Sequence, residues 1–101
     1  MELLPWIDEN KLDYTGLSSN PSDKALELLE QNQEKINWDQ LSYNSHPKAL
    51  ELLFKNPEKI YWNGLSRNLS DGALELLEKN PEKIVWYSLS YNSNPKVLEL
   101  L

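Results

Sequence analysis

The sequence repeats itself at a fixed interval, and this period constrains the fold more than any other feature. Tryptophans stand at positions 38, 62 and 86, so successive members of their column are separated by a step of twenty-four. The same step relates further columns, which are Leu17, Leu41, Leu65 and Leu89; Ser18, Ser42, Ser66 and Ser90; Asn20, Asn44, Asn68 and Asn92; Leu12, Ile36, Ile60 and Ile84; and Lys11, Lys35, Lys59 and Lys83. Such self-similarity is typical of stacked supersecondary units. Chains below about 40 residues rarely hold a core alone, so each unit is expected to pack on its neighbours.

The period divides the chain into units of one kind. With 101 residues there is room for one domain, and we expect a single tandem-repeat domain over residues 1–101. Its expected parts are an N-terminal cap and partial repeat over 1–21, full repeats over 22–45, 46–69 and 70–93, and a truncated C-terminal helix over 94–101.

The first half of each unit carries the signals of a short helix. In residues 46–69, Pro47 suits the first helical position, where a missing N–H costs nothing. Lys55 is the expected last residue, because Asn56 precedes Pro57 and is therefore disfavoured in the α region. Apolar residues three and four apart give this helix one buried face. The expected N-capping position is held by Ser22, His46, Ser70 and Asn94.

The second half of each unit suits either a strand or a second helix. A leucine-rich repeat would place a strand here, and the period of this chain lies within that family's range. Residues on one face of a strand share parity, however, whereas Trp62 and Leu65 are three apart. A strand would also turn Asn63 toward the core. We therefore expect an all-α fold, an α-solenoid of short helix pairs with about four repeats, and keep a leucine-rich-repeat-like α/β solenoid as the alternative.

Three of the columns are expected to serve the structure. The asparagines from Asn20 to Asn92 supply either a left-handed C-cap for the second helix or a side-chain bond to neighbouring backbone. The serines beside them are expected to pack closely and to bond a carbonyl. The tryptophans stand next to the isoleucine and leucine columns, which favours core packing over ligand stacking.

The most regular stretch of the unit reads Asn-Pro-Glu-Lys-Ile-x-Trp-x-x-Leu-Ser-x-Asn, followed by Pro-Lys-Ala-Leu-Glu-Leu-Leu. It resembles short tandem repeats in proteins of giant DNA viruses of algae and amoebae, and the opening from Leu3 to Tyr14 is similar to the start of such proteins. The resemblance covers essentially the whole chain. It implies a repeat fold and brings no known activity or catalytic residues. Tyr14 departs from the pattern, since other units have Trp there. A designed or engineered member of the pattern is the alternative origin.

Charge and composition disfavour several classes of partner. The formal net charge is −6, and an acidic protein repels phosphate backbones and anionic lipid. We therefore expect neither nucleic acid nor membrane as a partner. No apolar run approaches the roughly 20 residues of a membrane helix, and the N-terminus lacks the pattern of a signal peptide. The chain has no cysteine, which fits the cytoplasmic location that we expect.

No group of residues has the pattern of a catalytic, metal or cofactor site. His46 is the only histidine and stands in the capping column, with no carboxylate or nucleophile recurring near it in the sequence. The aligned serines have no base at a fixed spacing. The acidic residues near the N-terminus, Asp8, Glu9 and Asp13, lack the glycine and final glutamate of a calcium loop. We therefore expect no enzyme activity, no cofactor and no metal.

The candidates for a binding surface are the positions that vary from unit to unit while their neighbours stay fixed. They fall in the second half of the units, and tyrosine and arginine among them are favoured interface anchors. We expect a non-enzymatic scaffold that binds a protein partner through this variable face; the alternative is a structural or designed module with no specific partner. The candidate residues are Asn37, Asp39, Gln40, Tyr43, Tyr61, Asn63, Arg67, Val85, Tyr87 and Tyr91.

The last residues, Val97 to Leu101, begin another apolar helix face. Repeat stacks need a polar cap at each end, because a terminal unit has no neighbour on one side. An exposed apolar patch tends to find a partner. The sequence therefore predicts an end-to-end homodimer through the C-terminal helix.

Overall fold

The structure is a computed structural model, and it describes residues 13–100. Residues 1–12 of the expected N-terminal cap and partial repeat, which include Asp8, Glu9 and the column members Lys11 and Leu12, lie outside this described part, as does Leu101.

The described residues form helices at the positions that recur with the period. The first helices of the units are α2 (Asp23–Gln31), α4 (Pro47–Lys55) and α6 (Asp71–Lys79). The second helices are α1 (Tyr14–Ser19), α3 (Trp38–Leu41), α5 (Trp62–Arg67) and α7 (Trp86–Leu89). Short 3₁₀ helices follow the first helices and close the chain, as η2 (Gln33–Lys35), η3 (Pro57–Lys59), η4 (Pro81–Lys83) and η5 (Pro95–Glu99).

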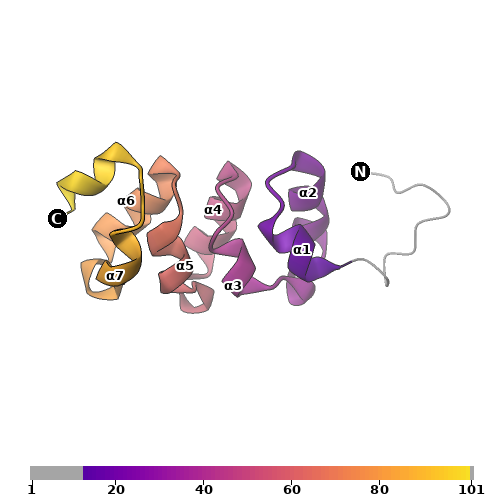
Figure 1. Cartoon of the computed structure of the whole chain (residues 1–101). Coiled ribbons are helices and arrows are strands. Elements are labelled where there is room, and N and C mark those ends of the chain that lie inside the picture. Colours follow the sequence, from indigo (N-terminus) through magenta and orange to yellow (C-terminus); the bar gives the residue numbers. More distant parts are fainter. Residues whose placement is uncertain (1–12, 101) are drawn as a thin grey trace, which may run out of the picture.

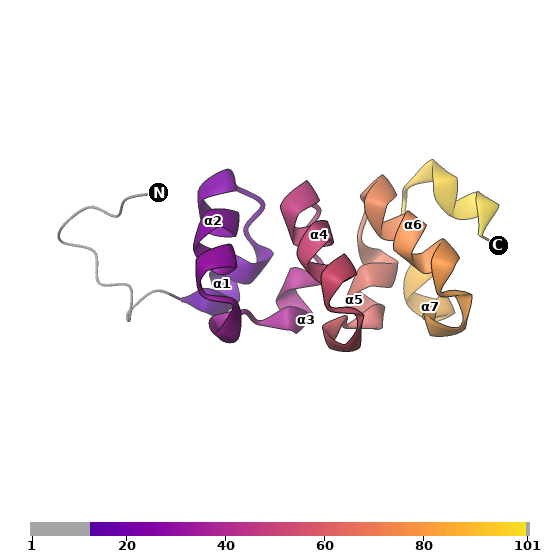
Figure 2. The same cartoon turned by 180° about the vertical axis from the view of Figure 1, so that it is seen from behind.

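The expected all-α class is confirmed over the described residues. No strand occurs between residues 13 and 100, so the strand that the leucine-rich-repeat alternative requires is absent there and that alternative is wrong. Figures 1 and 2 show the first helices side by side in one row and the second helices in another. The molecule is elongated along these rows, with extents of 50 × 24 × 18 Å.

The first helices begin and end through local side-chain bonds. The Oγ atoms of Ser22 and Ser70 each accept a hydrogen bond from the backbone N–H three residues later, both at 3.2 Å, which satisfies a donor that the helix leaves free. At the other end, the side-chain amide of Asn56 donates to the Leu52 carbonyl at 2.9 Å. Asn32 and Asn80 make the same bond in their units. The helix Pro47–Lys55 agrees with the limits predicted from the sequence.

The core is formed by small and aliphatic columns and only partly by the tryptophans. The leucines of the second helices, Leu41, Leu65 and Leu89, are fully buried, and the alanines and most leucines of the first helices pack with them. Trp38 and Trp62 are only partly buried, and 49% of Trp86 is exposed. The prediction of core tryptophans is therefore wrong for Trp86. Trp86 belongs to α7, the last of the second helices that the structure describes, whereas Lys59 of the following unit lies over the Trp38 ring.

The asparagine column joins each unit to the one before it. The side-chain amide of Asn68 donates two hydrogen bonds of 3.0 Å, to the carbonyls of Ser42 and Asn44. Its Oδ1 accepts from the backbone N–H of Ser70 at 3.0 Å. Asn44 and Asn92 repeat this arrangement in their own units. No non-glycine residue between 13 and 100 has a positive φ, so the left-handed cap is the wrong alternative and the side-chain bond is the right one.

The serine column makes a second link, in which the earlier unit supplies the side chain and the later unit supplies the backbone N–H. Ser42 Oγ donates to the Trp38 carbonyl at 2.9 Å and accepts from the backbone N–H of Tyr61, in the next unit, at 2.9 Å. Ser18 and Ser66 bond in the same way to the N–H groups of Asn37 and Val85. We call each contact between consecutive units a joint. Every joint thus buries two sets of hydrogen bonds beside its leucines, and buried polar groups with partners make the packing specific.

Candidate functional site

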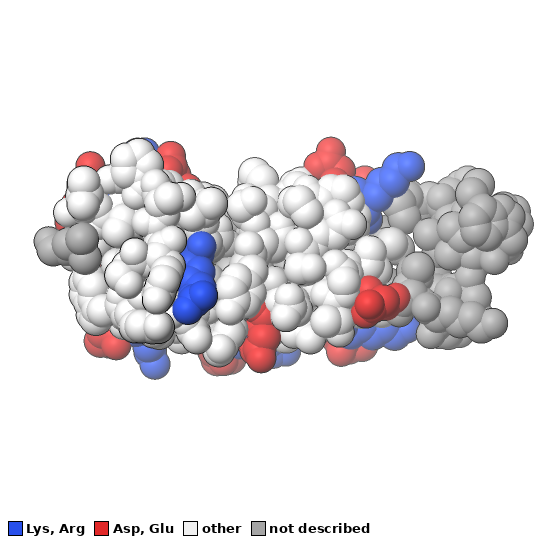
Figure 3. Space-filling model, in the orientation of Figure 1, with Lys and Arg blue, Asp and Glu red and all other residues white. Residues whose placement is uncertain are grey.

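The variable positions predicted as an interaction surface lie on the row of second helices. Six of them are exposed, namely Asp39, Tyr43, Tyr61, Arg67, Tyr87 and Tyr91; the other four are partly buried, namely Asn37, Gln40, Asn63 and Val85. Figure 3 views this row of helices and shows charged groups mainly along its upper and lower edges. The five exposed residues Tyr43, Tyr61, Arg67, Tyr87 and Tyr91 are called the aromatic face below.

Tyr43 and Tyr61 form one half of the aromatic face, across the joint between α3 and α5. Their ring centroids lie 6.2 Å apart and the planes are inclined by 60°, which is within the favoured range for aromatic pairs. The pair packs over Gly64, where an added Cβ would lie 3.0 Å from Tyr43 and 3.2 Å from Tyr61. A larger residue at this point would therefore push the two rings outward by a few tenths of an ångström.

Arg67, Tyr87 and Tyr91 form the other half. The Arg67 guanidinium lies 5.2 Å from the centroid of the Tyr91 ring, a cation–π distance. Tyr91 packs edge-on against Tyr87 at 5.4 Å, and their hydroxyl groups are 3.1 Å apart. The three side chains therefore support one another although all are exposed, which limits their freedom before any partner arrives.

Asn63 joins Tyr61 to α7, the helix that also carries Tyr87. Its side-chain amide donates to the Tyr61 hydroxyl at 3.1 Å, and its Oδ1 accepts a hydrogen bond from the hydroxyl of Ser88 on α7. Ser88 is buried and was not among the candidate residues. The signal that could have found it is its distance of 25 residues from Asn63, one period plus one, which places the two side chains at the same joint.

Four of the candidate residues have structural duties or stand apart. Asn37 Oδ1 accepts the backbone N–H of Gln40 at 3.2 Å, so Asn37 caps α3. Val85 donates its backbone N–H to Ser66 Oγ at 3.1 Å, a bond in which its side chain takes no part. Asp39 is exposed, and no ring contact joins it to the aromatic face in the described residues. Asn37, Gln40, Asp39 and Val85 therefore add less to a binding surface than the tyrosines and Arg67 do.

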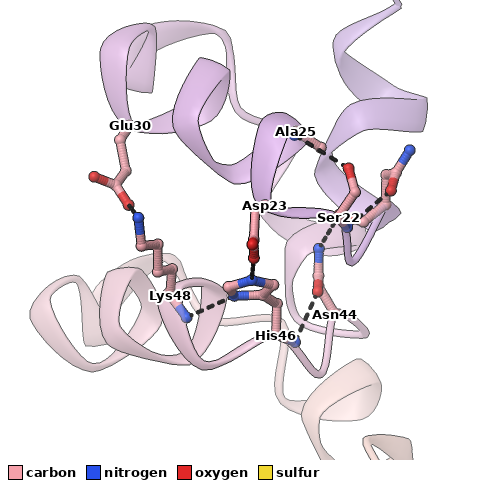
Figure 4. Close-up of polar contacts among 8 residues, drawn as sticks. Ser22, Asp23, Ala25, Glu30, Asn44, His46 and Lys48 are labelled. Carbon is pink, nitrogen blue, oxygen red and sulfur yellow. Dashed lines mark hydrogen bonds and ion pairs between the residues drawn. The ribbon is translucent and has the colours of Figure 1, made fainter. Parts of the chain in front are cut away.

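His46 has a carboxylate partner that sequence reasoning missed. Figure 4 shows its ring between Asp23 of the preceding unit and the backbone of Lys48. Nδ1 accepts the Lys48 N–H at 3.0 Å, so the ring proton sits on Nε2, which donates to Asp23 Oδ1 at 2.6 Å. This hydrogen bond, followed by the electrostatic attraction between the two side chains, lowers the pKa of Asp23 below its ordinary value of 3.8. The predicted capping role of His46 is confirmed.

The same contacts recur elsewhere without a histidine. Asn94 Oδ1 accepts the Lys96 N–H at 2.9 Å, and its amide donates to Asp71 Oδ1 at 2.9 Å. Asn94 and Asp71 occupy the positions of His46 and Asp23, shifted by two periods. Hydrogen bonds from Asn94 and Lys96 likewise lower the pKa of Asp71. An asparagine has no acid–base chemistry, so this arrangement needs only a side chain that both caps a helix and donates to a carboxylate.

Two further findings concern the described part of the chain. Between residues 13 and 100, no three side chains of the histidine, cysteine, aspartate and glutamate types gather closely enough to hold a metal ion. None of the described helices has the length and apolar character needed to cross a bilayer.

Comparisons of the chain with protein-family models, with curated proteins and with solved structures found no match. The resemblance to repeats of giant DNA viruses therefore stays a prediction.

Proposed function

We propose that this chain is a non-enzymatic repeat scaffold, a short α-solenoid, that binds a protein partner through the aromatic face. The observation that carries the proposal is the arrangement of four exposed tyrosines and Arg67 into two mutually supported groups on one row of helices. Large aromatic side chains and arginine supply most of the binding energy in protein interfaces. Side chains that are already ordered lose less entropy when a partner binds.

The chemistry of this row favours a protein over other partners. Across the four second-helix segments, 13–20, 37–44, 61–68 and 85–92, the charged residues are Asp13, Asp39 and Arg67 alone. Binding to nucleic acid depends on several phosphate contacts from lysine and arginine, which this row does not offer. The structural duty of His46, shared with Asn94, supports the absence of acid–base catalysis at the histidine.

The test replaces aromatic residues by residues that the repeat itself uses at the same positions. Tyr43 and Tyr91 share a column with Ser19, so Tyr43→Ser together with Tyr91→Ser should leave the fold intact. Binders selected from a random peptide library on the intact chain are expected to bind this variant at least about 30-fold more weakly, which corresponds to a hot-spot loss of about 2 kcal/mol. Isothermal titration calorimetry measures the difference.

The control for this test is Lys55→Gln, which takes the residue of the equivalent Gln31 on the row of first helices. It should change the affinity less than about twofold, as expected for a residue outside the interface. Binders that tolerate loss of both tyrosines, or a selection that yields no specific binder, would favour the alternative of a structural module without a partner.

We also propose the end-to-end homodimer through the C-terminal helix, on the exposure of Leu98. Val97 of η5 is buried, but 74% of Leu98 is exposed beside a hollow lined by Leu89 and Pro95. Sedimentation velocity over a hundredfold range of concentration is expected to show a concentration-dependent shift, and Leu98→Lys should abolish it, because a lysine there would lose its hydration in the contact. A sedimentation coefficient that stays constant for the unaltered chain would rule this dimer out.

A further inference from the structure

A hollow of about 210 Å³ lies between α4 and α6, on the row of helices that Figure 2 brings to the front. All its lining residues belong to these two helices. Leu50 and Phe54 of α4 and Gly72 of α6 form its apolar part, and 58% of the Phe54 side chain is exposed. Glu51, Glu75 and Lys79 form the charged part. The hollow is smaller than the roughly 300–1,000 Å³ of sites for drug-sized ligands, so its size suits one side chain.

The hollow stands where the equivalent joint carries an ion pair. At the preceding joint, Lys48 Nζ lies 3.9 Å from Glu30. The corresponding residues one period later are Gly72 and Phe54, and two periods later they are Lys96 and Glu78, which line one hollow together. At one joint, therefore, both the lysine and the glutamate of this pair are replaced, by Gly72 and Phe54. A random substitution at one exposed position would replace only one of them.

Because Gly72 has no side chain, Leu50 of α4 is less covered than the equivalent leucines of the other units. Leu26 is fully buried and Leu74 is 3% exposed at the equivalent positions, whereas Leu50 is only partly buried. A Cβ atom at Gly72 would lie 2.7 Å from Leu50 Cδ1, so the Leu50 side chain extends into the space that a side chain at position 72 would take. An apolar group from outside can therefore contact Leu50 and Phe54 together.

The rim of the hollow carries one carboxylate without a direct partner. Glu51 already forms an ion pair of 3.0 Å with the lysine one helical turn later, and Lys79 Nζ lies 5.2 Å above the Phe54 ring. The Glu75 carboxylate makes no hydrogen bond or ion pair within residues 13–100. The pKa of Lys96 is raised mainly by Asp71, and the charge of Glu75 adds only a smaller contribution. A cationic group beside the apolar one would therefore meet a negative charge that is free to pair, in a chain whose net charge is also negative.

We propose that this hollow is a second binding site, distinct from the aromatic face, for a peptide segment that presents an aliphatic side chain next to lysine or arginine. The aliphatic group contacts Leu50 and Phe54 above Gly72, and the cation pairs with Glu75. The site goes beyond the proposed function because it lies on the other row of helices and uses none of the tyrosines.

The experiment titrates the ¹⁵N-labelled full chain with two N-acetylated, C-amidated hexapeptides and follows amide chemical shifts. The first peptide has two central leucines flanked by arginines, and the second has glutamates in place of the arginines. The first is expected to cause saturable shifts in residues 50–54 and 72–79, with at least tenfold tighter binding than the second. Shifts centred on α3, α5 and α7, or equal binding of both peptides, would overturn the proposal.

Two sets of variants separate the site from the fold. Gly72→Lys with Phe54→Glu restores the lysine and glutamate that the other two joints have at these positions. Its melting temperature should stay close to that of the unaltered chain, because the flexible end of Leu50 can turn away from the new Cβ and a lysine suits a helix better than a glycine. This variant should bind the arginine peptide at least tenfold more weakly.

Glu75→Gln, which leaves the hollow open, should lower the affinity for the arginine peptide only. The variant Tyr43→Ser with Tyr91→Ser should bind normally, so the aromatic face can fail its test while this site passes. Unchanged binding by the restored variant would overturn the proposal.

Discussion

Replacing Asn68 with aspartate is expected to destabilise the chain by about 3–5 kcal/mol at pH 7, although the two side chains have nearly the same shape. The amide of Asn68 donates to two carbonyls at 3.0 Å. Asn68→Asp leaves both buried acceptors unsatisfied, at about 1–3 kcal/mol each, and faces them with a buried carboxylate. Such a loss is a large part of the roughly 5–15 kcal/mol that stabilises a small domain. Urea unfolding followed by circular dichroism measures it.

The pH dependence of Asn68→Asp distinguishes a lost donor from a general packing defect. Burial among acceptors raises the pKa of the introduced carboxyl group in the folded state. The loss should therefore be smallest below the unfolded pKa of about 3.9 and should grow as the pH rises toward the folded value. The control is Asn20→Asp, because the exposed side chain of Asn20 accepts from the backbone N–H of Ser22 and its amide donates no hydrogen bond within the described residues. A similar loss for both variants would contradict the role assigned to the amide of Asn68.

Leu65→Ala is expected to cost about 3–5 kcal/mol and to weaken the whole described part of the chain together. Leu65 is fully buried in α5 at the middle of the core, and a leucine-to-alanine change leaves a cavity as well as losing buried area. Neighbouring units supply most of each other's core, so loss at a central joint removes support on both sides. Denaturant curves from far-UV dichroism and from tryptophan fluorescence should therefore shift by the same amount.

The matched control for Leu65→Ala is Leu69→Ala, because more than half of the Leu69 side chain is exposed. It should cost less than about 0.5 kcal/mol. Dichroism and fluorescence curves that separate would show that units unfold one by one, and a small loss at Leu65 would show that the leucine column is not the centre of the core.

The sequence predicted the helices well because the signals that set their limits are local. Pro47, its capping neighbour His46 and the pair Asn56–Pro57 act within a few residues, and α4 begins and ends where they indicate. The exposure of Trp86 was not predictable in this way. Hydrophobicity places an indole near the core, but how deeply it lies depends on what the next element covers.

The exposure of the candidate residues followed the sequence pattern more closely than their contacts did, since six of the ten are exposed. A contact such as Tyr87 with Tyr91 follows from a spacing of four residues. The contacts of Asp23 with His46 and of Asn63 with Ser88 cross a joint, so their spacings of 23 and 25 residues reveal them only when the sequence is read one period back. The hollow at Gly72 and Phe54 depends on two departures from the repeat, and the sequence does not show that these two positions line one hollow.

The two polar links also restrict how a chain of this kind can change in length. Each unit presents amide donors toward the unit before it through its asparagine, and carbonyl acceptors toward the unit after it. Duplicating or deleting one whole period therefore adds or removes one matched set, and every remaining bond keeps its partner. A gain or loss of any other length within a unit would shift both columns and leave buried donors and acceptors unmatched. The joints therefore tolerate duplication or deletion of whole units only. The side chains of the exposed tyrosines and charged pairs take no part in these bonds, so they can differ from unit to unit.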